Sequence, residues 1–147
     1  MTRPRTILLL VLGAAAAFGA TTLVALEGKD VAVLHTRDDT GGARRTRVWV
    51  AESDGALWVE AATPERGFYR DLLQRPEIDV EHAGRAQRMI ARAEPGDAGH
   101  RRIRALLRDK YGWADRWVAL LQDTSRSVAV RLDPAPPPTG SGDAGAS

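Results

Sequence analysis

The chain has 147 residues, with 21 Lys and Arg against 19 Asp and Glu, so its net charge is only +2. It contains no cysteine, which excludes disulfides, thiolate metal sites, cysteine nucleophiles and iron–sulfur clusters. The arginines are scattered among acidic residues, with no dense basic stripe and no recognition motif, so we expect no binding to nucleic acid.

The first feature in chain order is an uncharged apolar run over residues 7–26. About 20 apolar residues span a bilayer core as a helix, so the run predicts an N-terminal single-pass transmembrane anchor. A cleavable signal peptide is the alternative, because Arg3 and Arg5 precede the run and Ala15–Ala17 offers a cleavage site. The length of the run favours the anchor. The two arginines favour a cytoplasmic segment 1–6 and a domain outside the cytoplasm, although Lys29 and later arginines leave a cytoplasmic domain open.

Three short strands are predicted next, over residues 31–36, 46–51 and 57–61. The first is a continuous apolar run, and the other two alternate between apolar and polar positions. Turn formers at 38–42 and at 53–55 separate them, which indicates an antiparallel meander.

A helix should follow, with Pro64 in its first turn and an apolar stripe that ends before Pro76. Residues 78–82 and 86–93 are predicted strands around an Ala83–Gly84 turn. The connections between the first three strands are too short for crossover helices, so we do not expect a parallel sheet.

The longest predicted helix opens at Pro95–Gly96–Asp97 and ends at Gly112, with its arginines at 101, 102, 104 and 108 facing water. A short helix around Trp117 and a strand over residues 127–132 complete the domain. The order predicts a mainly β fold with helices, a six-stranded barrel over residues 28–133. Residues 134–147 are rich in Pro, Gly and Ser and should be disordered.

A family resemblance rests on three segments of this domain. Gly42–Thr46, Phe68–Leu72 and Pro76–Ile78 stand in an order and spacing similar to the flavin- and deazaflavin-binding split β-barrels, the superfamily of pyridoxamine phosphate oxidase and of deazaflavin-dependent nitroreductases and quinone reductases. The resemblance covers about residues 28–134. It implies a split β-barrel that dimerises, with a cofactor between the subunits.

The chain departs from the deazaflavin branch at three places. That branch usually carries Trp where Phe68 stands, Asn where Asp71 stands, and a Lys- and Ser-containing glycine turn where this chain has the acidic turn Asp38–Gly42. An acidic turn is a poor neighbour for a polyanionic cofactor tail, whereas FMN carries one phosphate. The cofactor therefore stays undecided between FMN, a deazaflavin and none.

The residues that we expect at the cofactor come from two regions, as the resemblance implies. Arg45 and Arg47 share one face of a strand and can form a clamp for phosphate, and Arg66 and Arg70 lie four apart on a helix. Trp49 and Trp58 on neighbouring strands can wall a flat ring, or fill a core. The expected cofactor-binding set is Arg45, Thr46, Arg47, Val48, Trp49, Trp58, Arg66, Tyr69 and Arg70. No acid or base for catalysis stands out, and the three histidines suggest no metal site.

These features predict a membrane-anchored, FMN- or deazaflavin-dependent oxidoreductase of the nitroreductase and quinone reductase type. We expect it to reduce a small electron acceptor. A quinone is a candidate acceptor, because a lipid-soluble quinone and a membrane-anchored enzyme would be confined to one surface. The alternative is a barrel without catalysis that is free of cofactor or binds a planar, haem-like molecule.

Overall fold

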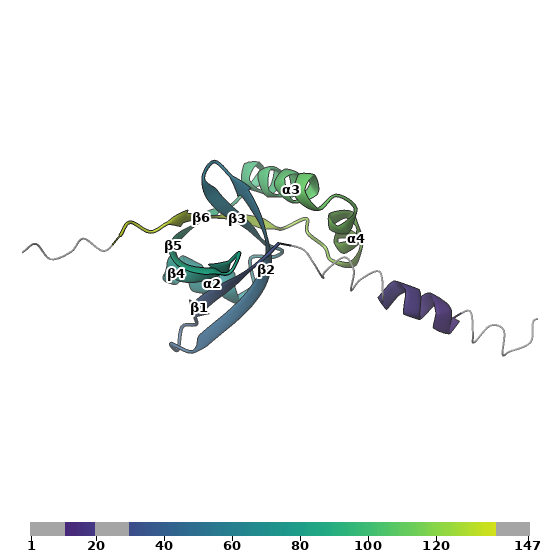
Figure 1. Ribbon diagram of the computed structural model, residues 1–147, viewed down its shortest axis with the longest axis horizontal. Helices are drawn as coiled ribbons and strands as arrows, with labels where there is room; N and C mark the ends of the chain where they lie inside the picture. The colour runs from purple at the N-terminus through teal and green to yellow at the C-terminus, as the bar shows by residue number, and fades with distance from the viewer. Residues whose placement is uncertain (1–10, 20–29, 138–147) are drawn as a thin grey trace, which may run out of the picture.

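The computed structural model describes residues 11–19 and 30–137 (Figure 1). The elements of the domain are β1 (Val31–Arg37), β2 (Ala43–Ser53), β3 (Ala56–Ala61), α2 (Gly67–Gln74), β4 (Glu77–His82), β5 (Arg85–Glu94), α3 (Asp97–Tyr111), α4 (Trp113–Leu121) and β6 (Val128–Pro134). The six strands form a closed antiparallel barrel in the order β1-β2-β3-β6-β5-β4. The predicted six-stranded barrel and its opening meander are confirmed.

The short turns form where the sequence places residues that tolerate a positive φ. Asp54 and Gly55 have φ of 53° and 72° between β2 and β3, and Ala83 and Gly84 have φ of 49° and 74° between β4 and β5. Two consecutive left-handed residues are the geometry of the two-residue hairpin turn whose twist matches the flanking strands. Both predicted hairpins are therefore present.

Alternation along the strands fills the inside of the barrel with apolar side chains. Leu34 of β1 is paired with Thr46 of β2 and with Val80 of β4, so these three side chains point to the same face. Leu34 and Val80 are buried, and α2 adds Phe68 and Leu72 to the same core. The barrel interior is therefore packed with side chains, and α2 belongs to it.

A second core lies on the outer face of the barrel, beneath α3. Ile103, Leu107 and Tyr111 of α3 cover Trp58 of β3 and Ala129 of β6. The wall formed by β3 and β6 is consequently buried on both faces, which explains why these two strands are buried almost without alternation. In Figure 1, α3 and α4 lie along one side of the barrel only.

The helices correspond to the predicted segments with two differences. Gly112 has φ of 53° and ends α3 by donating its N–H to the Arg108 carbonyl at 2.8 Å, as predicted. Pro64 lies in the turn before α2, which begins only at Gly67, so its predicted helical position is wrong. Arg104 is also wrongly predicted to face water, because α4 packs beside α3 and half-buries it.

The predicted transmembrane helix over residues 7–26 is wrong as far as the structure describes that segment. The described part of that segment, residues 11–19, is helical and covers about 14 Å, against a bilayer core of about 30 Å. Across 11–19 and 30–137, the helices all fall short of what a membrane span requires in length and apolar content. The single-pass membrane localisation depended on that helix and is corrected with it. Residues 7–10 and 20–26 lie outside the described residues, and so do residues 138–147 of the predicted disordered tail. The signal-peptide alternative concerns the same N-terminal segment and is not tested.

Candidate functional site

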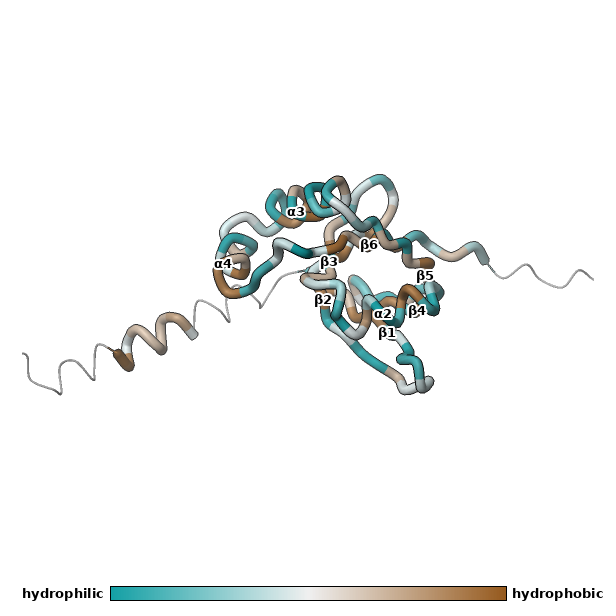
Figure 2. The backbone as a smooth tube through the Cα atoms, turned by 180° about the vertical axis from the view of Figure 1, so that it is seen from behind, coloured by the Kyte–Doolittle hydropathy of each residue, from teal (hydrophilic) through white to brown (hydrophobic). Residues whose placement is uncertain are grey.

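The β1–β2 hairpin carries two of the predicted arginines, Arg45 and Arg47, and its outer end is hydrophilic in Figure 2. Strand geometry alternates its side chains, so Arg45 and Arg47 point outward while Thr46 and Val48 point toward the barrel interior. The two arginines share a face, as predicted, and both are exposed.

A pocket opens on the helix side of this hairpin, between β2 and the elements α2, α3 and α4. Five residues of the predicted set line it: Thr46, Arg47, Val48, Trp49 and Arg66. Six residues outside the predicted set complete it: Glu60, Ala62, Phe68, Leu107, Val118 and Gln122. We call this the helix-side pocket; its volume is about 260 Å³.

Two cations of the helix-side pocket are available to a ligand. Arg47 and Arg66 are both exposed, and within the described residues neither forms an ion pair. One acidic side chain, Glu60, also lines the pocket, but Arg104 donates to it at 3.1 Å and binds Asp115 at 2.7 Å on its other side. Because Glu60 is already paired, the pocket presents a net positive charge to an anionic group.

An aromatic wall faces these cations. Trp49 is half-buried and stacks on Tyr111 of α3, with 4.7 Å between ring centroids and 23° between ring planes. The Tyr111 hydroxyl lies 2.7 Å from the Val50 carbonyl oxygen and also within reach of the Asp30 carbonyl. Burial raises the pKa of Tyr111 to about 12. Tyr111 is therefore a neutral, anchored ring that holds Trp49 in place.

The start of α2 is fixed against the hairpin by one buried carboxylate. Asp71 accepts a hydrogen bond from the Thr36 hydroxyl at 2.6 Å and another from Arg44 Nε at 2.8 Å. The Arg44 guanidinium lies across Gly67, where an added Cβ would come within 2.8 Å of Arg44 Cζ. Gly67 directly follows Arg66, so this contact positions a pocket arginine relative to β2.

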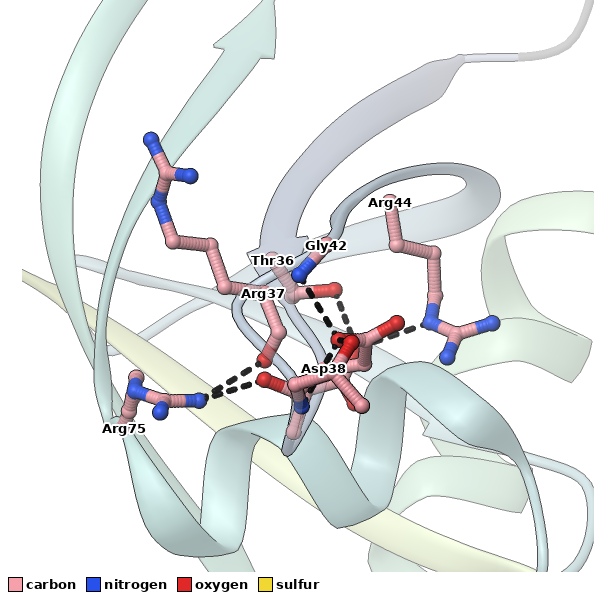
Figure 3. Close-up of polar contacts among 8 residues, drawn as sticks. Thr36, Arg37, Asp38, Gly42, Arg44 and Arg75 are labelled. Carbon is pink, nitrogen blue, oxygen red and sulfur yellow. Dashed lines mark hydrogen bonds and ion pairs between the residues drawn. The ribbon is translucent and has the colours of Figure 1, made fainter.

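The acidic turn lies beside this ion pair, as Figure 3 shows for Asp38, Gly42, Thr36, Arg44 and Arg75. Asp38 Oδ1 accepts the backbone N–H of Thr40 at 3.0 Å and of Gly42 at 2.7 Å, and also the Thr40 hydroxyl at 2.7 Å. The hydrogen bond from Thr40, followed by that from the Gly42 backbone, lowers the pKa of Asp38. The Asp38 carboxylate therefore accepts the hydrogen bonds that this turn could otherwise donate to an external anion.

Four residues of the predicted set lie elsewhere. Arg45 points to another hollow, 3.9 Å from Glu81, and Arg70 is exposed on α2 without lining the helix-side pocket. Tyr69 is buried in the barrel core. Trp58 is 0% exposed in the outer core, between the guanidinium groups of Arg102 and Arg131 at 4.7 and 5.6 Å from its ring. A cofactor role for these four residues stays a prediction, and the geometry does not support it.

The opposite end of the barrel holds a larger pocket of about 660 Å³ and a cluster that sequence spacing did not indicate. His82 Nε2 lies 2.6 Å from Asp30 Oδ1, and Lys110 binds the other oxygen of that carboxylate at 2.6 Å. Glu52 completes a group of possible metal-binding side chains with His82 and Asp30. These residues come from distant parts of the chain, which is why no local motif revealed them. One exposed arginine that forms no ion pair among the described residues, Arg85, lines this larger pocket, and no Phe, Trp or Tyr does. Because the helix-side pocket combines two such arginines with an aromatic wall, we place the candidate site there.

Comparison with known proteins identifies the family. Residues 11–134 match the F420H(2)-dependent quinone reductase family, which is most of the chain. The chain belongs to this family. The predicted resemblance to the deazaflavin-binding split barrels is thereby confirmed, and no curated protein matches the chain.

Solved structures support the same fold. A conserved hypothetical protein from Mycobacterium tuberculosis is similar with a TM-score of 0.58 and 16% identity, over 80% of this chain and 79% of the other. A structure named F420 reductase has a TM-score of 0.52 and 18% identity, over 78% and 93% of the two chains. The heme storage protein HutZ from Vibrio cholerae has a TM-score of 0.56 and 15% identity, over 77% and 87%. At these identities, the similarities establish the fold that this quinone reductase family member shares with all three.

Proposed function

We propose that this member of the F420H(2)-dependent quinone reductase family binds a deazaflavin in the helix-side pocket and uses it to reduce a quinone-type acceptor. The observation that carries the proposal is the joint placement of Arg47, Arg66 and Trp49 around one pocket. Family membership favours a deazaflavin over FMN, and the family name supports a quinone as the acceptor.

The chemistry of the pocket residues suits the two ends of such a cofactor. Arg47 and Arg66 would hold a phosphate, because guanidinium groups bind it through paired charge-assisted hydrogen bonds. Trp49 and Phe68 would contact the flat ring. The volume of about 260 Å³ is small beside the roughly 300–1,000 Å³ of usual ligand pockets, so part of the cofactor would extend along the surface. When bound, a deazaflavin supplies the hydride, and the chain's own part is to bind and orient it.

Changing the two pocket arginines tests the proposal. We expect Arg47→Ala and Arg66→Ala each to weaken deazaflavin binding about tenfold, since each removes one charged partner of the phosphate. Arg70→Ala is the matched control, because Arg70 lies on α2 close to Arg66 but does not line the pocket. Quenching of deazaflavin fluorescence gives the affinity, and reduction of a water-soluble quinone by the reduced deazaflavin gives the activity.

The possible results separate the alternatives. Wild-type protein that binds FMN but no deazaflavin would overturn the choice of cofactor. If Arg70→Ala weakens binding as much as Arg66→Ala, the pocket assignment is wrong. A wild-type chain that binds neither would favour the planar-ligand barrel without catalysis. The homodimer that the resemblance implied stays a prediction, to be tested by light scattering with and without cofactor.

A further inference from the structure

Three metal-binding side chains meet at the end of the barrel that holds the larger pocket. Asp30 directly precedes β1, Glu52 lies near the end of β2, and His82 ends β4. Because β2 and β4 both pair with β1 in antiparallel orientation, the start of β1 meets the ends of its two neighbours. Each of the three residues offers one ligand atom, and these atoms all lie within 4.8 Å of one another. We call Asp30, Glu52 and His82 the three-strand cluster.

The three-strand cluster carries more negative than positive charge. Lys110 Nζ binds Asp30 Oδ2 at 2.6 Å, and His82 Nε2 lies 2.6 Å from Asp30 Oδ1. Among the described residues, no cation forms an ion pair with Glu52, although Glu52 lies in the same cluster. With a neutral His82, two carboxylates therefore face one ammonium group, and a cation held between them would compensate the excess negative charge.

The donor set suits a divalent transition metal such as Zn²⁺. Imidazole nitrogen and carboxylate oxygen both bind Zn²⁺, at about 2.0–2.2 Å, and two such ligands of a tetrahedral ion are roughly 3.3 Å apart. Binding would therefore replace the 2.6 Å contact between His82 and Asp30 by two metal–ligand bonds, after the ring moves by less than about 1 Å. Lys110 binds the other oxygen of Asp30, as the hydrogen-bonding partner of a metal-binding carboxylate commonly does.

The cluster is anchored on its barrel side and open on its pocket side. The His82 side chain is only 10% exposed, whereas that of Asp30 is 36% exposed and Glu52 is exposed. Glu52 and His82 also line the pocket of about 660 Å³, through which an ion can enter. Three protein ligands leave a further position on Zn²⁺ for water or another small ligand.

We propose that Asp30, Glu52 and His82 form a binding site for Zn²⁺ or a similar divalent transition metal. The site shares no residue with the helix-side pocket, so the proposal does not depend on deazaflavin binding. A bound ion would join the ends of three strands. It would stabilise the folded chain, because the unfolded chain does not hold the three ligands together.

Calorimetric titration of the full chain with Zn²⁺ alone, and without an affinity tag, tests the proposal. We expect one bound Zn²⁺ with a Kd below about 100 µM, and a midpoint of thermal unfolding that rises with Zn²⁺ concentration. His82→Gln and Glu52→Gln should each weaken binding at least about tenfold, because each removes one of three ligands. His35→Gln is the matched control and should change neither quantity. His35 also contacts a carboxylate, Glu81 at 2.7 Å, but among the described residues no third metal-binding side chain joins that pair.

Co²⁺ in place of Zn²⁺ gives a second, spectroscopic test. Coordination by the cluster predicts visible absorption bands of bound Co²⁺ that His82→Gln weakens and His35→Gln retains. A wild-type Kd for Zn²⁺ above about 100 µM would overturn the proposal, as would folded His82→Gln and Glu52→Gln variants with wild-type affinity. Circular dichroism checks the fold of each variant. Glu52 is exposed, so Glu52→Gln keeps the proposal testable if the variant of the largely buried His82 does not fold.

Discussion

Arg104 should be the most costly arginine of α3 to remove, because the buried Asp115 and the largely buried Glu60 depend on it. It reaches from α3 to Glu60 on β3 and to Asp115 in the first turn of α4. The side chains of Arg104 and Glu60 are 13% exposed, and that of Asp115 is 4% exposed. Arg104→Ala would leave two carboxylates buried without a counter-charge, whereas water can solvate a surface carboxylate that loses its partner.

The expected loss follows from that burial. Removing one partner of a buried ion pair costs about 3–5 kcal/mol in the free energy of unfolding. With a urea dependence of roughly 1.5 kcal/mol per molar, the unfolding midpoint should fall by about 2–3 M urea. Arg104→Lys should lose less, because an ammonium keeps the charge but cannot face both carboxylates with paired donors.

Urea unfolding followed by tryptophan fluorescence measures this loss. Arg88→Ala is the control: Arg88 is exposed and lies 3.3 Å from Asp79, so its removal should cost less than about 1 kcal/mol. Combining Arg104→Met with Glu60→Gln and Asp115→Asn removes all three charges and should recover at least half of the loss. A midpoint for Arg104→Ala within about 0.5 M of wild type would refute the reasoning.

Two further predictions concern the helix α3. Burial raises the pKa of Tyr111 to about 12, so between pH 10 and pH 12 the unfolded chain releases this proton while the folded chain keeps it. The free energy of unfolding should therefore fall by about 2–3 kcal/mol across that range, and Tyr111→Phe should abolish this decline; an equal decline in the variant would contradict the assignment. Gly99→Ala should destabilise by about 2–3 kcal/mol, since an added Cβ would lie 1.9 Å from the Glu94 carbonyl oxygen. Thermal unfolding measures the loss of stability. Ala105→Gly, at an exposed position of the same helix, is the control and should cost about 1 kcal/mol. A Gly99→Ala variant as stable as wild type, or more stable, would show that the backbone shifts to accommodate the added methyl group.

Local patterns predicted much of the barrel because its strands alternate and its turns are short. The residues at 54–55 and 83–84 set the hairpins, and the Gly112 cap ends α3 as expected. The transmembrane prediction failed because it was inferred from the length and apolar composition of the run alone. The prediction that Arg104 faces water failed because helical periodicity indicates only which face of α3 is polar. It cannot indicate that α4 packs beside that face.

The candidate site was predictable only in part. The strand pattern placed Arg47 and Trp49 on the same face of the strand, and the family resemblance added Arg66. The predicted clamp of Arg45 and Arg47 does not form around one pocket. Arg47 lines the helix-side pocket together with Arg66, whereas Arg45 lines another hollow. Glu60 and Val118 enter the pocket through packing between elements distant in the chain, for which a single sequence offers no local signal.

The wall that separates the two cores has a consequence for how the protein opens. Because β3 and β6 are covered from inside the barrel and from α3, separating either strand exposes both cores at once, and partial unfolding there costs nearly as much as global unfolding. β4 and β5 have only the inner core behind them and present an exposed outer face to water. Fluctuations should therefore begin at the β4–β5 hairpin. Trp49 packs against the outer core, so its side of the proposed cofactor pocket belongs to the part of the molecule that opens last.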